Sequence, residues 1–370
     1  MYLGVFFIRQ TIELKNNKVI SNMKEIKIND AFVNKENPFI SIVFSFYNEE
    51  NVLAELIKRV RTVMKKEKER KIISGYEMIF VNDASNDNSK AILKDESLVE
   101  NDLLIVDMSR NFGVSECVIV GFKIAKGDAV VYMDCDLQDP PELIPEMVNK
   151  WKEDLNVEVV YTTRRKRHGE RFAKLALTKF GYRLINSLGD IDLPIDSGDF
   201  KLLSRRAIKH ILSLKEQKPY LRGMVSWIGF KQAQIFYDRD GRLDGKENTK
   251  FPVLSKRVIY GYLDRALISF SDAPLKIMLL IGLFVSIIAI GYIGIVIVQK
   301  VLGLHDPGWP ALMASILLLG GVQLSVLGII GLYIGGIFTN VKGRPLSVIN
   351  SIIGPDERLN EIELNDLNSL

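Results

Sequence analysis

The sequence of 370 residues lacks the features that mark several common classes of protein. Its two cysteines, Cys117 and Cys135, are too few for a disulfide framework, and its three histidines are isolated, without the spacing of a zinc site. The net charge of +4 is too small to indicate a nucleic-acid-binding protein. No G-x-G-x-x-G follows the first predicted strand, residues 39–46, and no G-x-x-x-x-G-K-[ST] occurs within residues 38–252. A dinucleotide-dependent dehydrogenase and a P-loop NTPase are therefore disfavoured.

Charged residues are absent from two long apolar stretches near the C-terminus, residues 277–298 and 311–338. At 1.5 Å per residue the first stretch is roughly 33 Å long as a helix, enough to cross a hydrocarbon core of about 30 Å. Buried helices of soluble proteins seldom run so far without a charge. We therefore predict a membrane protein with two transmembrane helices.

Basic residues flank these two stretches unevenly. The loop between them, residues 299–309, contains a single basic residue, Lys300. The positive-inside rule therefore predicts that the N-terminal region and the C-terminus both lie in the cytoplasm, where a reducing environment keeps the cysteines as thiols. The basic residues outside the loop are Lys256, Arg257, Arg265, Lys276, Lys342 and Arg344.

Three other segments lie outside the predicted catalytic domain and the two spans. Residues 1–37 are a mixed extension without the pattern of a secretory signal, and Met23 is an alternative start. Residues 253–274 form a juxtamembrane segment in which apolar residues recur at helical spacing. We expect an interfacial amphipathic helix there, and a helix packed on the sheet is the alternative. Residues 341–370 are predicted to be a cytoplasmic tail, acidic and mobile from Pro355.

Between these segments, residues 38–252 alternate between strand and helix patterns. The apolar, β-branched run of residues 39–46 reads as a strand buried on both faces, as in a parallel sheet. Further strands are predicted at residues 77–81, 103–108 and 129–133, and helices at 49–71, from 89 and at 115–126. This alternation predicts a doubly wound α/β sheet.

Polar residues follow each of these strands, at the edge where such sheets bind ligands. Asp134 and Asp136 end the strand at 129–133, and Gln138 follows. Oxygen ligands of this kind suit Mg²⁺ or Mn²⁺ together with a substrate's phosphates, although a solvated polar turn gives the same pattern. The other strand-end residues are Tyr47, Glu49, Asp83, Arg110 and Asn111.

These clusters resemble the inverting glycosyltransferase family 2, which has the GT-A (nucleotide-diphospho-sugar transferase) fold. Within it, the chain is most similar to the polyprenyl-phosphate glycosyltransferases, the group that includes dolichol-phosphate mannosyltransferase and bactoprenol glucosyltransferases. The resemblance spans roughly residues 39–340. The matching stretches are SIVFSFYNEE (41–50), VNDASNDNS (81–89), SRNFG (109–113), MDCDLQDPPE (133–142), GDFKLLSRRA (198–207), RGMVSWIGF (222–230), DRDGRLDG (238–245) and FSDAPLK (270–276).

The resemblance implies roles for individual residues. Asp83 would hold the base or ribose of the nucleotide, and Arg110 and Asn111 would lie near the nucleotide and sugar. Asp134 and Asp136 match the family's D-x-D, with Asp136 a direct ligand of Mg²⁺ or Mn²⁺ and Gln138 a further one. Asp199 matches the acidic residue at the sugar–acceptor end. Basic residues expected near the phosphates are Arg205, Arg239 and Arg242.

Two departures from the family's pattern stand out. Ser45 replaces the proline usual in the first motif, which removes backbone stiffness rather than chemistry. The loop from Gly245 to Phe251 is about two residues longer than usual, which puts the role of Lys250 in doubt.

The function implied is inverting transfer of one hexose from a nucleotide-diphosphate sugar, UDP-glucose or UDP-N-acetylglucosamine, to polyprenyl phosphate. The product would be a lipid-linked sugar for cell-envelope glycosylation, used by a flippase and a downstream glycosyltransferase, and the enzyme could form a homo-oligomer. A phosphate acceptor is already ionised at neutral pH, so we assign Asp199 to positioning rather than proton removal. One alternative is a processive polysaccharide synthase, but Arg222 and Trp227 are too far apart for Q-x-x-R-W. Another alternative is an inactive membrane scaffold that keeps the fold.

Overall fold

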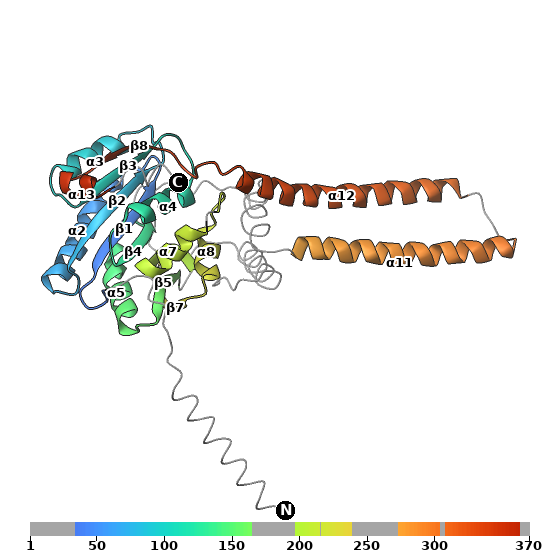
Figure 1. Ribbon diagram of the computed structural model, residues 1–370, viewed down its shortest axis with the longest axis horizontal. Coiled ribbons are helices and arrows are strands. Elements are labelled where there is room, and N and C mark those ends of the chain that lie inside the picture. Colours follow the sequence, from blue (N-terminus) through green and yellow to red (C-terminus); the bar gives the residue numbers. More distant parts are fainter. Residues whose placement is uncertain (1–33, 165–196, 215, 239–272, 304–307, 363–370) are drawn as a thin grey trace, which may run out of the picture. The chain divides into compact units, whose positions relative to one another are not determined.

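The computed structural model contains an eight-stranded mixed sheet in the order β7-β5-β6-β4-β1-β2-β3-β8 (Figure 1). The structure describes residues 34–164, 197–214, 216–238, 273–303 and 308–362. The central strands β1 (Phe39–Phe46), β2 (Gly75–Asn82), β3 (Leu103–Met108) and β4 (Ala129–Asp134) are parallel. These are the four strands predicted from the apolar runs.

Helices cover both faces of the sheet. The core on one face includes residues of α2 (Leu53–Glu69) and α5 (Ile144–Glu153), which follows the short 3₁₀ turn η1 (Pro141–Leu143). The core on the other includes residues of α4 (Val114–Ile124), α7 (Arg205–Ser213) and α8 (Leu221–Trp227). The remaining helix of the predicted alternation is α3 (Ser89–Ser97). The doubly wound α/β arrangement expected from the sequence is therefore confirmed.

Strand direction decides which residues reach which edge. β5 (Val157–Arg164) and β7 (Lys231–Tyr237) are parallel to each other, whereas β6 (Ser197–Ser204) is antiparallel to both β4 and β5. The beginning of β6 therefore lies at the carboxyl edge of the parallel strands, and its end lies at their amino edge.

The C-terminal segment corrects one prediction. β8 (Ile349–Ile353) pairs antiparallel with β3, and α13 (Asp356–Glu361) follows it. Arg358 of α13 is only 8% exposed, and its Nε donates to Glu77 Oε2 on β2 at 2.8 Å. The tail predicted to be mobile from Pro355 is thus packed on the catalytic sheet as far as residue 362, because its apolar side chains and one arginine find buried partners there.

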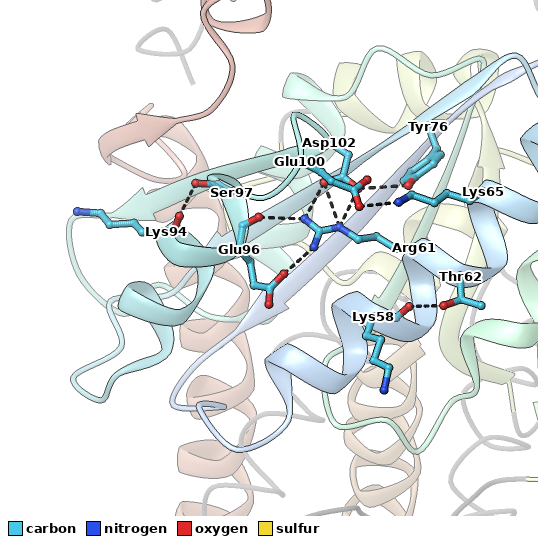
Figure 2. Close-up of polar contacts among 10 residues, drawn as sticks. All are labelled: Lys58, Arg61, Thr62, Lys65, Tyr76, Lys94, Glu96, Ser97, Glu100 and Asp102. Atoms are coloured by element: carbon cyan, nitrogen blue, oxygen red, sulfur yellow. Dashed lines mark hydrogen bonds and ion pairs between the residues drawn. The ribbon is translucent and has the colours of Figure 1, made fainter.

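A second buried arginine joins α2 to α3 and to the turn before β3 (Figure 2). Arg61 donates to Asp102 Oδ1 at 2.9 Å and to Glu96 Oε2 at 2.6 Å, and the Tyr76 hydroxyl donates to Asp102 at 3.2 Å. Arg61 is 8% exposed, so its charge needs these partners. The network stabilises the sheet on the side away from the strand ends that carry the polar clusters.

Two apolar helices, α11 (Ala273–Val301) and α12 (Trp309–Val341), contact each other. Both are long and apolar enough to cross a membrane, over Ile277–Gln299 and Leu318–Val341. Their leucine and isoleucine side chains are largely exposed, for example Leu279 at 73% and Leu324 at 71%. Residues 253–272 of the predicted juxtamembrane segment and residues 1–33 of the predicted extension at 1–37 lie outside the described residues.

Candidate active site

A pocket of about 400 Å³ opens at the carboxyl edge of β1, β2 and β4. Ligands of doubly wound sheets bind at this edge. The sequence-predicted residues that line it come from three separate strand ends, and the pocket brings them together. They are Tyr47, Glu49, Asp83, Asp134, Asp136 and Gln138, joined by Ser45, Phe46, Val114 and Cys135.

Two loops that border the pocket are tied together by hydrogen bonds. Asn48 has φ of 58°, a left-handed conformation that asparagine tolerates, and its side-chain oxygen accepts from the amide of Asn86 at 2.9 Å. The Glu49 amide donates to Ser89 Oγ at 3.0 Å. The polar run after β2 thus holds the turn after β1, and this fixes Tyr47 and Glu49 at the rim.

Asp83 holds the loop that follows β3. It is 5% exposed, and its two carboxylate oxygens accept from the backbone amides of Phe112 at 2.7 Å and Gly113 at 3.0 Å. The Arg110 guanidinium stacks on the Phe112 ring at 3.9 Å, and the Asn111 amide donates to the Asp83 carbonyl at 3.4 Å. Asp83 therefore lines the pocket and also orders the loop that carries Arg110 and Asn111.

Asp134 and Asp136 face the pocket from the end of β4. Leu137 has φ of 55°, which is unusual for a leucine, and the Gln138 amide donates back to Asp136 Oδ1 at 3.1 Å. The Gln138 side-chain oxygen is buried and has no hydrogen-bond partner among the residues that the structure describes. Within the described part of the chain, no three histidine, cysteine, aspartate or glutamate side chains are grouped to bind a metal on their own. Any cation here would need amide or substrate oxygens as well.

Asp199, near the start of β6, reaches the same edge of the sheet. The register that pairs Tyr132 of β4 with Lys201 of β6 places Asp134 and Asp199 at the ends of adjacent strands. Arg222 of α8 donates to both oxygens of Asp199, at 2.7 and 2.6 Å. Burial raises the pKa of Asp199, but the hydrogen bonds and charge of Arg222 outweigh it, so the pKa lies below its usual range.

Arg205 is not in this site, which corrects its predicted role at the phosphates. It follows the end of β6, and its guanidinium donates to the Gly127 carbonyl at 2.9 and 2.6 Å, just before β4 begins. That is the amino edge of the sheet, opposite the pocket. The prediction failed because the motif does not reveal that β6 runs antiparallel. Arg239, Arg242 and Lys250 lie outside the described residues.

Two residues of this edge were not assigned from the sequence. Arg222 lies in the matching stretch RGMVSWIGF, but only the fold shows that it faces Asp199. Lys201 lies within the apolar strand β6, two residues after Asp199, and is 2% exposed. A lysine within an otherwise buried strand, two residues after a predicted site aspartate, is the sequence signal that could have indicated it.

Comparison of the sequence with known proteins identifies the family. Residues 41–212 match the model of the family described as glycosyl transferase family 2. The chain is 42% identical to an uncharacterized glycosyltransferase, YkcC, of Bacillus subtilis, over 86% of this chain and 95% of that one. It is 34% identical to the SfII prophage-derived bactoprenol glucosyl transferase of Shigella flexneri, over 84% and 97%.

Among solved structures, glucosyl-3-phosphoglycerate synthase from Mycobacterium tuberculosis matches at 20% identity, over 63% of this chain and 80% of that one. Its TM-score of 0.43 is too low to bear on the site. The chain belongs to glycosyl transferase family 2 and is a glycosyltransferase with a GT-A-like fold.

Proposed function

We propose that this enzyme transfers a single hexose, with inversion, from a nucleotide-diphosphate sugar to polyprenyl phosphate. The pocket in which Asp83, Asp134 and Asp136 meet is the observation that carries the proposal. The names of relatives such as the bactoprenol glucosyl transferase of Shigella flexneri support a polyprenyl acceptor. We favour undecaprenyl phosphate as the acceptor, UDP-glucose or UDP-N-acetylglucosamine as the donor, and a lipid-linked sugar for the cell envelope as the product.

A divalent cation fits the residues at the end of β4. Asp134, Asp136 and the unpartnered side-chain oxygen of Gln138 are an all-oxygen donor set, which suits Mg²⁺ or Mn²⁺. Mg²⁺ commonly takes one or two carboxylates and completes its coordination with substrate phosphates, so Asp134 and Asp136 suffice as its carboxylate ligands. When bound, the cation would neutralise charge on the leaving diphosphate.

The other residues of the pocket would bind and orient the donor. Each carboxylate oxygen of Asp83 already accepts a hydrogen bond from one backbone amide. A hydrogen bond from the nucleotide would use the remaining lone pairs of these oxygens. The loop that those bonds order presents Arg110, whose exposed guanidinium can form charge-assisted hydrogen bonds with phosphate oxygens. Tyr47, 47% exposed at the rim, offers an aromatic surface to a base.

Asp199 would position the reacting groups rather than remove a proton. In the transfer, an acceptor oxygen bonds to the anomeric carbon as the bond from that carbon to the diphosphate oxygen breaks, and the electron pair leaves with the diphosphate. A phosphate monoester, with a second pKa of about 6, needs no base at neutral pH. The carboxylate of Asp199, held by Arg222 and with a lowered pKa, is a weak base but can stabilise positive charge developing on the sugar.

The fold also supports the proposed membrane topology. β8 follows α12 and pairs with β3, so the chain on either side of the two apolar helices belongs to one sheet. If both helices span the membrane, both of their outer ends lie on one side. The basic residues that flank them, against the single Lys300 between them, support the cytoplasm as that side.

The test uses membranes that contain the full chain, undecaprenyl phosphate and a panel of labelled nucleotide sugars. We expect one donor to label the lipid phase with one sugar per lipid. Asp136→Asn should abolish the labelling. Glu153→Gln, a matched change at an exposed carboxylate paired with Lys150, should not.

Other labelling results would contradict the proposal. Label in a long polymer would support the processive synthase instead. No labelled lipid from any donor, with Mg²⁺ or Mn²⁺ present, would refute the proposal and favour an inactive scaffold. For Asp199→Asn we expect a lower rate but the pH dependence of the wild type between about pH 5 and 7, where a carboxylate with a lowered pKa is already ionised. Loss of an acidic fall of activity in that range would instead indicate a general base.

A further inference from the structure

Lys201 lies in the interior of the catalytic sheet, next to the site but away from the pocket. It is 2% exposed, and it is paired in register with Tyr132 of β4 on one side and Tyr161 of β5 on the other. Tyr132 belongs to the core on the side of α4, α7 and α8, and Lys201 is paired with it in register; Asp199 binds Arg222 of α8, so Lys201 and Asp199 project to the same side of the sheet. The Tyr132 hydroxyl on that side is buried without a hydrogen-bond partner among the described residues. A lysine is rarely buried this deeply unless its charge is balanced by an opposite charge nearby.

The charges that act on Lys201 are those of the ion pair formed by Asp199 and Arg222. Burial lowers the pKa of Lys201 to about 8, the Asp199 carboxylate opposes that shift, and the Arg222 charge adds to it. In turn, the Lys201 charge helps to lower the pKa of Asp199. Of the cations that act on Asp199, Arg222 and Lys201 differ in their exposure to solvent. The side chain of Arg222 is 29% exposed, whereas Lys201 is enclosed.

We propose that Lys201 is a positioning residue for sugar transfer, which acts through Asp199 by keeping the carboxylate ionised and in place as the acceptor phosphate arrives. The inference rests on the proposed function. A phosphate dianion near Asp199 repels its negative charge and competes for Arg222, which can turn toward solvent. Lys201 cannot follow the phosphate, because it is enclosed in the sheet. Its charge therefore stays with Asp199 while Arg222 is shared with the acceptor.

Loss of the Lys201 proton should therefore reduce activity. The wild-type rate is expected to fall as the pH rises through about 8. The titratable and charged groups that act on this cluster come from β4, β5, β6 and the α8 region, and they are Tyr132, Asp134, Tyr161, Arg164, Asp199, Tyr220 and Arg222.

The experiment compares wild type, Lys201→Met and Lys201→Arg in the lipid-labelling assay, with the donor that labels the lipid in the wild type. Lys201→Met should lower kcat by about tenfold or more and leave the KM for the donor within about twofold, since the donor pocket is built from other strands. Its Tm should equal or exceed that of the wild type, because the substitution removes a buried charge. Lys201→Arg should retain more activity, and its alkaline fall should move to higher pH.

The control is Lys123→Met. Lys123, near the end of α4, also has a pKa lowered by burial to about 8, but it lies outside the site. This variant should keep the wild-type kcat and the alkaline fall.

Several results would overturn the proposal. A Lys201→Met variant with wild-type kcat, or with activity lost only in step with a lower Tm, would make Lys201 structural. If Lys201→Met does not fold, Lys201→Arg decides: an alkaline fall at the wild-type pH refutes the role. Failure of the wild type itself to label polyprenyl phosphate refutes the proposed function, and the role of Lys201 falls with it.

Discussion

The ion pair between Arg358 of α13 and Glu77 of β2 predicts that the segment after the apolar helices stabilises the catalytic domain. Arg358 donates to Glu77 at 2.8 Å and also to the Ile124 carbonyl, and both charged side chains are nearly enclosed, at 8% and 5% exposure. Arg358→Met keeps most of the apolar stem but leaves the Glu77 carboxylate buried without its cation. Removal of one partner of a buried pair costs about 3–5 kcal/mol.

This free energy translates into a large change in thermal stability. For a domain of about 150–250 residues, 1 kcal/mol shifts the Tm by about 2–4 °C, so Arg358→Met should lower it by roughly 6–20 °C. The assay is thermal unfolding of the full chain in detergent. The fluorescence of Trp151, which is fully buried in the core, reports the loss of the sheet.

Two further variants separate this ion pair from its exposed surroundings. Glu361→Gln removes a second carboxylate that contacts Arg358 at 3.1 Å, but 52% of that side chain is exposed, so the Tm should barely change. Glu77→Gln combined with Arg358→Met should recover part of the lost stability, because no buried charge remains without a partner. An Arg358→Met variant with a wild-type Tm would refute the conclusion that the C-terminal segment is part of the catalytic fold.

Three other predictions concern the metal, Asp199 and the packing of the sheet. Chelation should abolish lipid labelling, and Mg²⁺ or Mn²⁺ should restore it. Labelling that persists in a chelator would refute the assignment of a metal ion to Asp134 and Asp136. The pKa of Asp199 is lowered in the fold, so its stabilising effect is complete above the unfolded value of about 3.9 and is lost as the pH falls through the lower folded value. The Tm difference between wild type and Asp199→Asn should therefore narrow below about pH 4. Gly127→Ala should cost about 1–3 kcal/mol, since a Cβ there would lie 2.6 Å from the Ser41 backbone nitrogen, whereas Gly331→Ala in α12 meets open space and should leave the Tm unchanged.

Elements whose signals are local could be predicted from the amino-acid sequence alone. The apolar run of β1, the helical spacing of α2 and the two uncharged stretches each reflect burial along one segment, and the structure has the expected element at each. Parallel strands also place their carboxyl ends at one edge. The meeting of Asp83, Asp134 and Asp136 therefore follows from the order of strands and helices along the chain.

Features that depend on strand direction and on pairing between distant segments are set by the tertiary fold. The motif around residues 198–207 gives no sign that β6 is antiparallel, and this direction brings Asp199 to the site and takes Arg205 away from it. The pairing of Asp199 with Arg222 joins residues that are 23 positions apart. β8 is predicted from the sequence only as part of a cytoplasmic tail and α13 as part of its acidic, mobile end, because their partners, β3 and Glu77, lie more than 240 positions earlier in the chain. Local periodicity indicates which side chains are buried. The groups against which they are buried come from distant segments, and only the tertiary structure brings these segments together.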